Sequence, residues 1–170
     1  KPDLADVHSN LGNLLRELGN LEEAEKITRK AIELNPDIAQ AHYNLGIILI
    51  NLGDLKEAEN SYRKAIKINP NYAIAHSNLG SILKDLGNLE EAELFTRKAI
   101  MMNPKSPSLY FNLGNILKDQ MKLEEAEFFT RKAITMNPHL IQAYLSLVYI
   151  LMKRGSLDES ELIINKAIKI

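Results

Sequence analysis

Apolar residues recur along this chain at the three- and four-residue spacing that is typical of amphipathic helices. In the first part of the chain this pattern covers residues 5–18 and 21–34, with Gly19 and Asn20 between the two stretches. Glycine suits the left-handed conformation that often follows a helix end, and asparagine suits the residue that begins the next helix. The pattern therefore predicts two helices joined by a tight turn.

The whole helical pattern repeats with a period of 34 residues. Leu-Gly, Arg-Lys-Ala-Ile and Asn-Pro each recur in one register, as does Leu-Glu-Glu-Ala-Glu. A fixed period of this length is typical of solenoids, in which a hairpin buries its apolar face only against its neighbours. We expect the tail of an earlier repeat at residues 1–4, repeats at 5–38, 39–72, 73–106 and 107–140, and a shortened fifth repeat at 141–170.

The turn inside each repeat carries residues that favour helix ends. Gly19, Gly53, Gly87 and Gly155 occupy the expected left-handed position. A capping residue and a glutamate three positions later predict capping boxes at Asn20 and Glu23, Asp54 and Glu57, Asn88 and Glu91, and Ser156 and Glu159. Met121 and Lys122 replace these residues in the fourth repeat, so we expect its turn to be the weakest.

This pattern resembles the tetratricopeptide repeat family, whose repeats share the same period. In the first repeat the residues that match the family pattern are His8, Leu11, Gly12, Leu15, Ala24, Ala31 and Pro36. The fifth repeat departs from the pattern at Val148 and Ser160, where the family has glycine and alanine. The resemblance covers essentially the whole chain. It implies an all-α, right-handed superhelical solenoid whose first helices line a concave surface that binds protein.

A polar stripe lies opposite the apolar face of each first helix, and the resemblance places this stripe on the concave surface. The sixth residue of the repeat is an asparagine in four successive repeats and Ser146 in the fifth. A side-chain amide offers both a donor and an acceptor, which matches one peptide unit of an extended chain. Helices pack roughly 8–10 Å apart and an extended peptide advances about 3.3 Å per residue, so each asparagine could meet every third residue of a peptide.

We therefore predict a peptide-binding surface formed by Asn10, Asn13, Gln40, Asn44, Asn51, Asn78, Ser81, Lys84, Asn112, Asn115 and Lys118. A second interpretation stays open, in which the four asparagines bind neighbouring helices instead of a ligand. The asparagine row resembles the ladder in the repeats of O-linked N-acetylglucosamine transferase, and residues 75–80 and 87–92 are similar to that family's repeats. Microbial transferases that carry tetratricopeptide repeats fit equally well.

Composition narrows the classes of function. The chain has 21 basic and 22 acidic residues and a formal net charge of -1, which gives no electrostatic case for nucleic acid or a membrane surface as partner. It has no cysteine, which excludes disulfides and thiolate chemistry and fits a cytoplasmic location. No apolar run approaches the roughly 20 residues that a membrane helix needs.

Residue types that can catalyse reactions or bind metals are present, but their positions in the repeat favour structural roles. His8, His42 and His76 recur at the large packing position of the repeat, too far apart to share one metal ion. The paired glutamates open the second helices, where capping explains them better than acid–base catalysis. The chain lacks a phosphate loop, a zinc motif and a nucleophile elbow. Three phenylalanines are expected to pack between repeats: Phe95, Phe128 and Phe129.

The sequence thus predicts a protein-interaction scaffold without catalytic activity, cofactor or metal, whose partner is an extended peptide or protein segment. One alternative is the substrate-recruiting arm of a glycosyl- or sulfotransferase, and another is a purely architectural or self-assembling spacer. Both ends look like cuts through a longer array. Uncapped ends would expose Leu147, Leu151, Ile164 and Ile168, which predicts end-to-end association.

Overall fold

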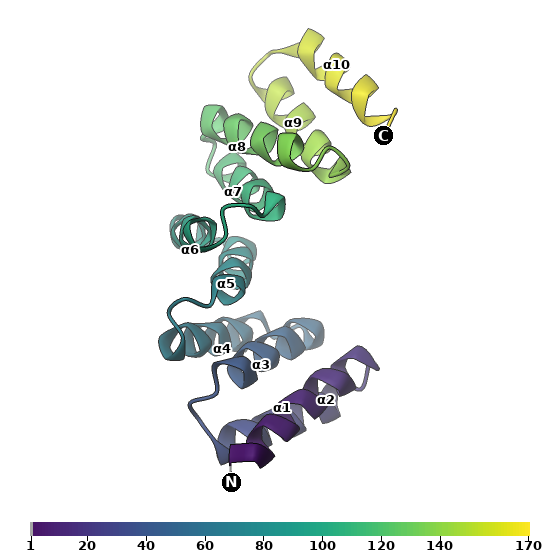
Figure 1. Cartoon of the computed structure of the whole chain (residues 1–170). Coiled ribbons are helices and arrows are strands. Elements are labelled where there is room, and N and C mark those ends of the chain that lie inside the picture. Colours follow the sequence, from purple (N-terminus) through teal and green to yellow (C-terminus); the bar gives the residue numbers. More distant parts are fainter. Residues whose placement is uncertain (1) are drawn as a thin grey trace. The chain divides into compact units, whose positions relative to one another are not determined.

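The computed structural model describes the backbone of residues 2–170 and the side chains of residues 4–170. This part of the chain forms ten α-helices and no strand, and the helices follow one another in pairs (Figure 1). The fold is therefore an all-α repeat solenoid, as predicted. The helices are α1 (Pro2–Glu17), α2 (Leu21–Leu34), α3 (Ala39–Leu52), α4 (Leu55–Ile68), α5 (Ala73–Asp85), α6 (Leu89–Met102), α7 (Pro107–Asp119), α8 (Leu123–Met136), α9 (Ile141–Lys153) and α10 (Leu157–Ala167).

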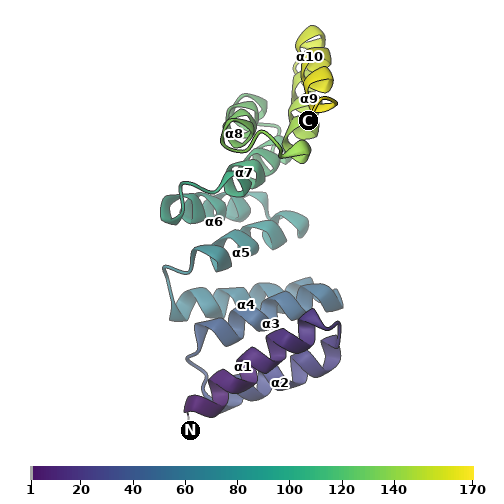
Figure 2. The same ribbon diagram turned by 45° about the vertical axis from the view of Figure 1, so that its right-hand side comes forward.

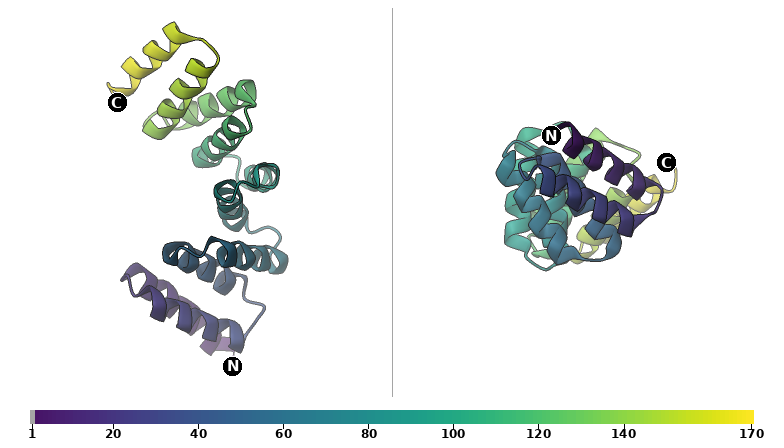
Figure 3. Two further views of the ribbon diagram at one scale, coloured as in Figure 1. Left: turned by 180° about the vertical axis from the view of Figure 1, so that it is seen from behind. Right: turned by 90° about the horizontal axis from the view of Figure 1, so that it is seen from below.

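The chain divides between Ile82 and Leu83 into two compact units. In the first unit α1 packs against α2 and α3 against α4, while α3 also contacts both helices of the preceding pair (Figure 2). In the second unit α7 pairs with α8 and α9 with α10, and α6 contacts α7 (Figure 3). Lys1, in the tail predicted at residues 1–4, lies outside the described residues, and Pro2–Leu4 form the first turn of α1.

Close packing within a pair depends on small residues at fixed repeat positions. Gly46 of α3 lies against Tyr62 of α4, where an added Cβ would come within 2.7 Å of the tyrosine ring. Gly114 of α7 lies against Thr130 of α8 in the same way, at 2.4 Å from the hydroxyl oxygen. These contacts explain why the Leu-Gly pair recurs in the first helices. The alanines of the second helices are fully buried as well: Ala24, Ala31, Ala58, Ala65, Ala92, Ala99, Ala126 and Ala133.

Apolar residues at one repeat position differ in exposure according to their neighbours. Val7, Leu11 and Leu14 of α1 are exposed, because no hairpin precedes α1 within the described residues. Their equivalents in α3 are buried against the first pair of helices: Ala41, Leu45 and Ile48.

The residues predicted to be exposed at the last repeat divide into two groups. Ile164 of α10 and Ile168, which directly follows α10, are exposed, as expected. The prediction for Leu147 and Leu151 was wrong, because both are buried in a cluster with Ile134 of the preceding repeat. They lie on the face of α9 that meets this preceding repeat.

The glycines in the turns adopt the expected left-handed conformation, with φ between 81° at Gly19 and 87° at Gly53. Met121 takes the same conformation with a φ of 61°, and no other non-glycine residue in the described chain has a positive φ. A side chain in this region costs about 1–2 kcal/mol. The turn of the fourth repeat therefore has the same backbone conformation as the others, and Met121 is strained.

Of the four predicted capping boxes, only the N-cap half at Asp54 forms within the described residues. The Asp54 carboxylate accepts a hydrogen bond from the Glu57 backbone N–H at 2.9 Å, as expected for an N-cap. The side chains of Asn20, Asn88 and Ser156 make no capping hydrogen bond, so this prediction was wrong for them. Their turns are closed by backbone hydrogen bonds instead.

Arginines of the second helices tie successive repeats together through carboxylates. Arg97 binds Glu93 of its own helix at 2.8 Å and Glu125 of the next repeat at 3.0 Å. Arg29 makes the equivalent pairs with Glu25 and Glu57. Glu57 and Glu125, the third residues of their helices, thus bind an arginine of the preceding repeat and not the backbone N–H of their own N-cap residue. A charge-assisted hydrogen bond to a guanidinium is stronger than one to a neutral amide. Arg131 follows the same scheme with Glu127 and Glu159.

The three phenylalanines do not share one environment. Phe129 of α8 stacks on Tyr110 of α7, with 6.3 Å between ring centroids and 15° between ring planes. Phe128 was predicted to pack between repeats, and this prediction was wrong because 62% of the residue is exposed. Neighbouring positions on a helix point about 100° apart, so only one of the two rings can face the joint. Within residues 2–170 no helix is long and apolar enough to span a membrane.

Candidate functional site

A polar hollow of about 440 Å³ lies between α1 and α3 in the first unit. Four residues of the predicted peptide-binding surface meet there: Asn10 and Asn13 from α1, and Gln40 and Asn44 from α3. Their spacing of three or four residues places each pair on one face of its helix. The remaining lining residues are Arg16, Tyr43 and Ile47.

Asn44 is buried and hydrogen-bonded within the protein. Its amide nitrogen donates to the Ser9 hydroxyl at 3.2 Å and to the Ser9 carbonyl at 3.4 Å, across to α1. Its amide oxygen accepts from the Gln40 side chain at 2.7 Å. Gln40 in turn accepts a hydrogen bond from the Tyr72 hydroxyl at 2.6 Å. This chain of polar contacts holds α1 and α3 in register.

Asn78 of α5 also binds a neighbouring repeat. Its amide nitrogen donates to the hydroxyls of Tyr62 at 3.3 Å and Tyr43 at 3.5 Å. The rings of Tyr43 and Tyr62 lie 5.7 Å apart. Burial raises the pKa of both hydroxyls, and it raises the pKa of Tyr72 to about 12. These hydroxyls therefore stay protonated at neutral pH and act as neutral hydrogen-bonding groups.

Asn10 and Asn112 differ from the other two asparagines of the row. Asn10 is exposed at the hollow, and Asn112 of α7 is partly buried. In the part of the chain that the structure describes, neither side chain makes a hydrogen bond within the protein. The second interpretation of the row thus applies to Asn44 and Asn78.

The equivalent face of the second unit is more basic and carries an aromatic ring. Tyr149 of α9 is exposed, with the ammonium groups of Lys118 and Lys153 at 5.3 and 5.6 Å from its ring centroid. Lys118 also pairs with Asp119 at 3.4 Å. Next to them the Ser146 hydroxyl donates to the Asn115 amide oxygen at 2.7 Å, between α9 and α7.

The other predicted residues lie outside the hollow. Asn51 is exposed near the end of α3, and Lys84 pairs with Asp85 at 2.8 Å. The Ser81 hydroxyl donates to the Ser77 carbonyl within α5 at 3.2 Å. Sequence reasoning missed Tyr43, which stands directly before the buried asparagine. A second aromatic residue at the same spacing from the repeat start, Phe111, is the only signal that could have drawn attention to that position.

Two of the recurring histidines, His42 and His76, bind backbone carbonyls of the preceding turn. The ring Nε2 of His42 donates to the Pro36 carbonyl at 2.8 Å, and His76 binds the Pro70 carbonyl at 2.9 Å. Tyr110, at the same repeat position, donates to the Pro104 carbonyl at 3.0 Å. Each contact ties the start of a first helix to the preceding turn. Among the described residues, no group of three or more histidines and carboxylates could hold a metal ion.

Comparison with known proteins assigns the class that this architecture defines. Sequence models of the tetratricopeptide repeat match residues 5–38, 39–72, 61–93, 107–140 and 141–170. The fold and the site define a class of protein, the all-α solenoid of paired helices whose first helices carry a polar face. The chain belongs to the tetratricopeptide repeat family. The resemblance to the repeats of O-linked N-acetylglucosamine transferase stays a prediction.

Solved structures show the same fold. MamA from Desulfovibrio magneticus RS-1 is 22% identical with a TM-score of 0.92, and the match covers 98% of this chain and 94% of that chain. For PilF from Pseudomonas aeruginosa the identity is 24%, the TM-score 0.86 and the coverage 98% and 76%. YrrB, described as a tetratricopeptide repeat protein with an unusual peptide-binding site, is 23% identical with a TM-score of 0.84 and coverage of 95% and 84%. No curated protein sequence matches the chain.

Proposed function

We propose that this protein is an interaction module that binds an extended peptide segment, and that the hollow between α1 and α3 is a contact site for it. The observation that carries the proposal is the free amide of Asn10, which opens into a hollow lined by further polar side chains. An amide in this position can donate to a peptide carbonyl and accept from a peptide N–H. Such contacts do not depend on the identity of the peptide's side chains.

The residues around Asn10 have different tasks in this proposal. Asn44 and Gln40 position the two helices, because their polar groups are already paired across the hollow. Ile47, which is partly exposed beside the buried Tyr43, adds apolar surface for a side chain of the peptide. Asn112 offers an equivalent free amide on the second unit.

A few neutral hydrogen bonds give only weak binding. Each contributes about 0.5–1.5 kcal/mol net, so the loss of the Asn10 amide should weaken binding by about 2- to 12-fold. Higher affinity would come from side-chain contacts and from several repeats acting together. The peptide-binding site of YrrB, a protein of the same fold, supports this kind of function without fixing the residues involved here.

The proposal is tested with peptides selected from a random display library on the immobilised protein. Binding of a selected peptide is then measured by isothermal titration calorimetry for the unaltered protein, Asn10→Ala and Asn165→Ala. We expect weaker binding for Asn10→Ala at unchanged thermal stability. Asn165→Ala is the matched control, because it removes an exposed helical amide from α10, outside the hollow and outside the predicted peptide-binding surface, and it should bind normally. Equal affinity of all three proteins for every selected peptide would contradict the assignment of this hollow.

A further inference from the structure

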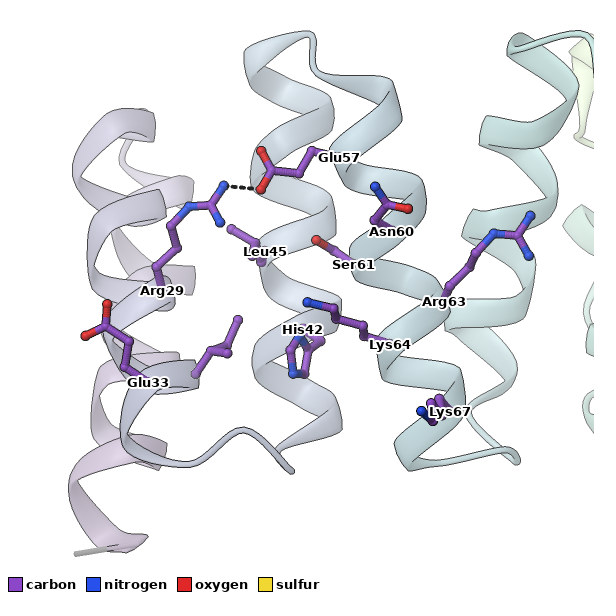
Figure 4. A pocket seen from close by; sticks show the side chains of 11 residues that line it. Arg29, Glu33, His42, Leu45, Glu57, Asn60, Ser61, Arg63, Lys64 and Lys67 are labelled. Carbon is purple, nitrogen blue, oxygen red and sulfur yellow. Dashed lines mark hydrogen bonds and ion pairs between the residues drawn. The ribbon is translucent and has the colours of Figure 1, made fainter.

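A second hollow, of about 590 Å³, lies between α2, α3 and α4 and shares no residue with the polar hollow (Figure 4). Its volume falls within the roughly 300–1,000 Å³ that ligand pockets usually have. Arg29 of α2 forms one wall, His42 and Leu45 of α3 form the floor, and Ser61 of α4 faces the space from the other side. We call this space the Ser61 hollow.

The Ser61 hollow exists because a small residue stands where the repeat otherwise has a large one. Ser61 occupies the twenty-third position of its repeat. The other four repeats have large apolar residues there: Ile27, Phe95, Phe129 and Ile163. A serine side chain leaves most of the volume of a phenyl ring unfilled, whereas protein interiors are close-packed and contain few voids larger than a water molecule.

The fourth repeat shows what fills the same space. The Phe129 ring stacks on Tyr110 and receives the Arg97 guanidinium at 5.3 Å from its centroid. Phe129 and Ile100 both pack against the cluster that contains Leu113. The residues two repeats earlier that correspond to these four neighbours all line the Ser61 hollow: Arg29 and Ile32 from the first repeat, and His42 and Leu45 from the second.

The second repeat has not lost its aromatic residue but has moved it one position along α4. Tyr62 follows Ser61, whereas Thr130 follows Phe129. A shift by one residue turns a side chain by about 100° around the helix, so the Tyr62 ring lies against Gly46 instead. It does not line the Ser61 hollow, and the space stays open.

The mouth of the hollow carries positive charge. Lys64 and Lys67 line it, and neither forms an ion pair within the described part of the chain. Figure 4 shows Lys64 extending from α4 across the space above His42. The hollow continues into a second space of about 600 Å³, which adds Pro36, Ile68 and one carboxylate, Asp37, at the rim. Glu33 and Glu57 also line it, and they pair with Lys30 and Arg29.

We infer that the Ser61 hollow is a socket for an aromatic side chain of a partner protein, held between Arg29 and His42, with an acidic residue next to it that meets Lys64 and Lys67. The ring of the partner takes the place that Phe129 has in the fourth repeat. An aromatic ring gains from burial and from the guanidinium at its face, and the acidic neighbour gains from two unpaired ammonium groups. This site is independent of the polar hollow and of the proposed function.

The test uses three small probes that separate ring from charge: N-acetyl-Asp-Phe-amide, N-acetyl-Asn-Phe-amide and N-acetyl-Asp-Ala-amide. Binding is followed by NMR through the methyl groups of Leu45 and Ile32. We expect saturable shifts with both Phe probes, a several-fold lower dissociation constant for the acidic one, and no saturable shift with the Ala probe. Absence of saturable shifts with N-acetyl-Asp-Phe-amide up to its solubility limit would overturn the inference.

Variants distinguish the socket from unspecific binding. Ser61→Phe should fill the space as Phe129 does, raise the melting temperature and abolish the shifts. Lys26→Phe is the matched control, because it adds the same ring at an exposed position of α2 outside the hollow, and it should bind like the unaltered protein. Lys64→Gln should remove most of the preference for the acidic probe.

If Ser61→Phe does not fold, Ser61→Leu provides a smaller filling group with the same expected loss of binding. Normal binding by a folded, filled variant would show that the probes bind elsewhere and would refute the socket. A melting temperature of Ser61→Phe below that of the unaltered protein would show that the space does not fit an aromatic ring.

Discussion

The second and fourth repeats follow one sequence pattern and differ in where an aromatic ring lies. The second repeat comprises α3 and α4, and the fourth comprises α7 and α8. In the fourth repeat Phe129 fills the joint with the preceding repeat. In the second repeat Tyr62 lies between α4 and α3, and the joint is left open beside Ser61. The identity of two adjacent residues thus decides where the aromatic ring packs. It lies either in the joint with the preceding repeat or between the two helices of its own repeat.

The contacts that Tyr62 gains are specific to the second repeat. Its hydroxyl and that of Tyr43 accept from the Asn78 amide, which binds the next first helix to this pair. In the fourth repeat the equivalent Thr130 is buried against Gly114, and its hydroxyl makes no hydrogen bond within the described residues. The asparagine row therefore takes part in different contacts in different repeats.

The two repeats should differ most in the free energy of unfolding that is lost when the aromatic ring is removed. Tyr62→Ala should lower the free energy of unfolding by about 3–5 kcal/mol, because the ring is fully buried and the cavity cannot close. Phe129→Ala should cost less, since Phe129 is partly exposed. Urea denaturation followed by circular dichroism measures both values. An equal or larger loss for Phe129→Ala would break the comparison.

A smaller difference is expected at the turns inside the two repeats. Met121→Gly should raise the free energy of unfolding by about 1 kcal/mol, because it removes a side chain from the left-handed region. The reciprocal change Gly53→Met should lower it by about 1–2 kcal/mol. Thermal and urea unfolding of both variants provide the measurement. If Met121→Gly is destabilising, then the exposed methionine side chain makes a contact that outweighs the strain.

The smallest expected effect concerns pH, and it compares His42 with Tyr110. Burial lowers the pKa of His42, Lys64 lowers it further, and the Pro36 carbonyl and Asp37 act in the opposite direction. Below the ordinary histidine pKa of about 6.5, the unfolded chain binds a proton at this position more readily than the folded chain does. The stability that His42 contributes is therefore present above that pH and is lost as the pH falls below it.

His42→Tyr should remove this loss, because Tyr110 shows that a tyrosine hydroxyl can bind the preceding proline carbonyl. The measurement is the difference in melting temperature between pH 7.5 and pH 5.5, about one unit either side of the ordinary histidine pKa. We expect a smaller difference for His42→Tyr than for the unaltered protein. The remaining histidines serve as an internal control, since both proteins contain them. The same pH dependence in both proteins would show that His42 is not its source.

Much of the architecture could be predicted from the sequence. The 34-residue period and the glycines in the turns predicted the paired helices, because local backbone preference and a repeated apolar face act through residues close together in the chain. The capping boxes at Asn20, Asn88 and Ser156 were predicted with the same kind of local rule and do not form. The burial of Leu147 and Leu151 also escaped local reasoning, because it depends on the neighbouring repeat.

The sequence by itself determined the helices, their pairing, the repeat and the set of polar residues from which a binding surface is drawn. Only the tertiary structure decided that the Asn44 and Asn78 side chains bind within the protein, whereas the Asn10 and Asn112 amides make no hydrogen bond among the residues that the structure describes. It also decided that Ser61 leaves a hollow. The position of a residue within the repeat determines the face of the helix on which it lies. Whether its polar group is free depends on the side chains that the next helix brings within about 3 Å, and those lie some 16–35 residues away in the chain.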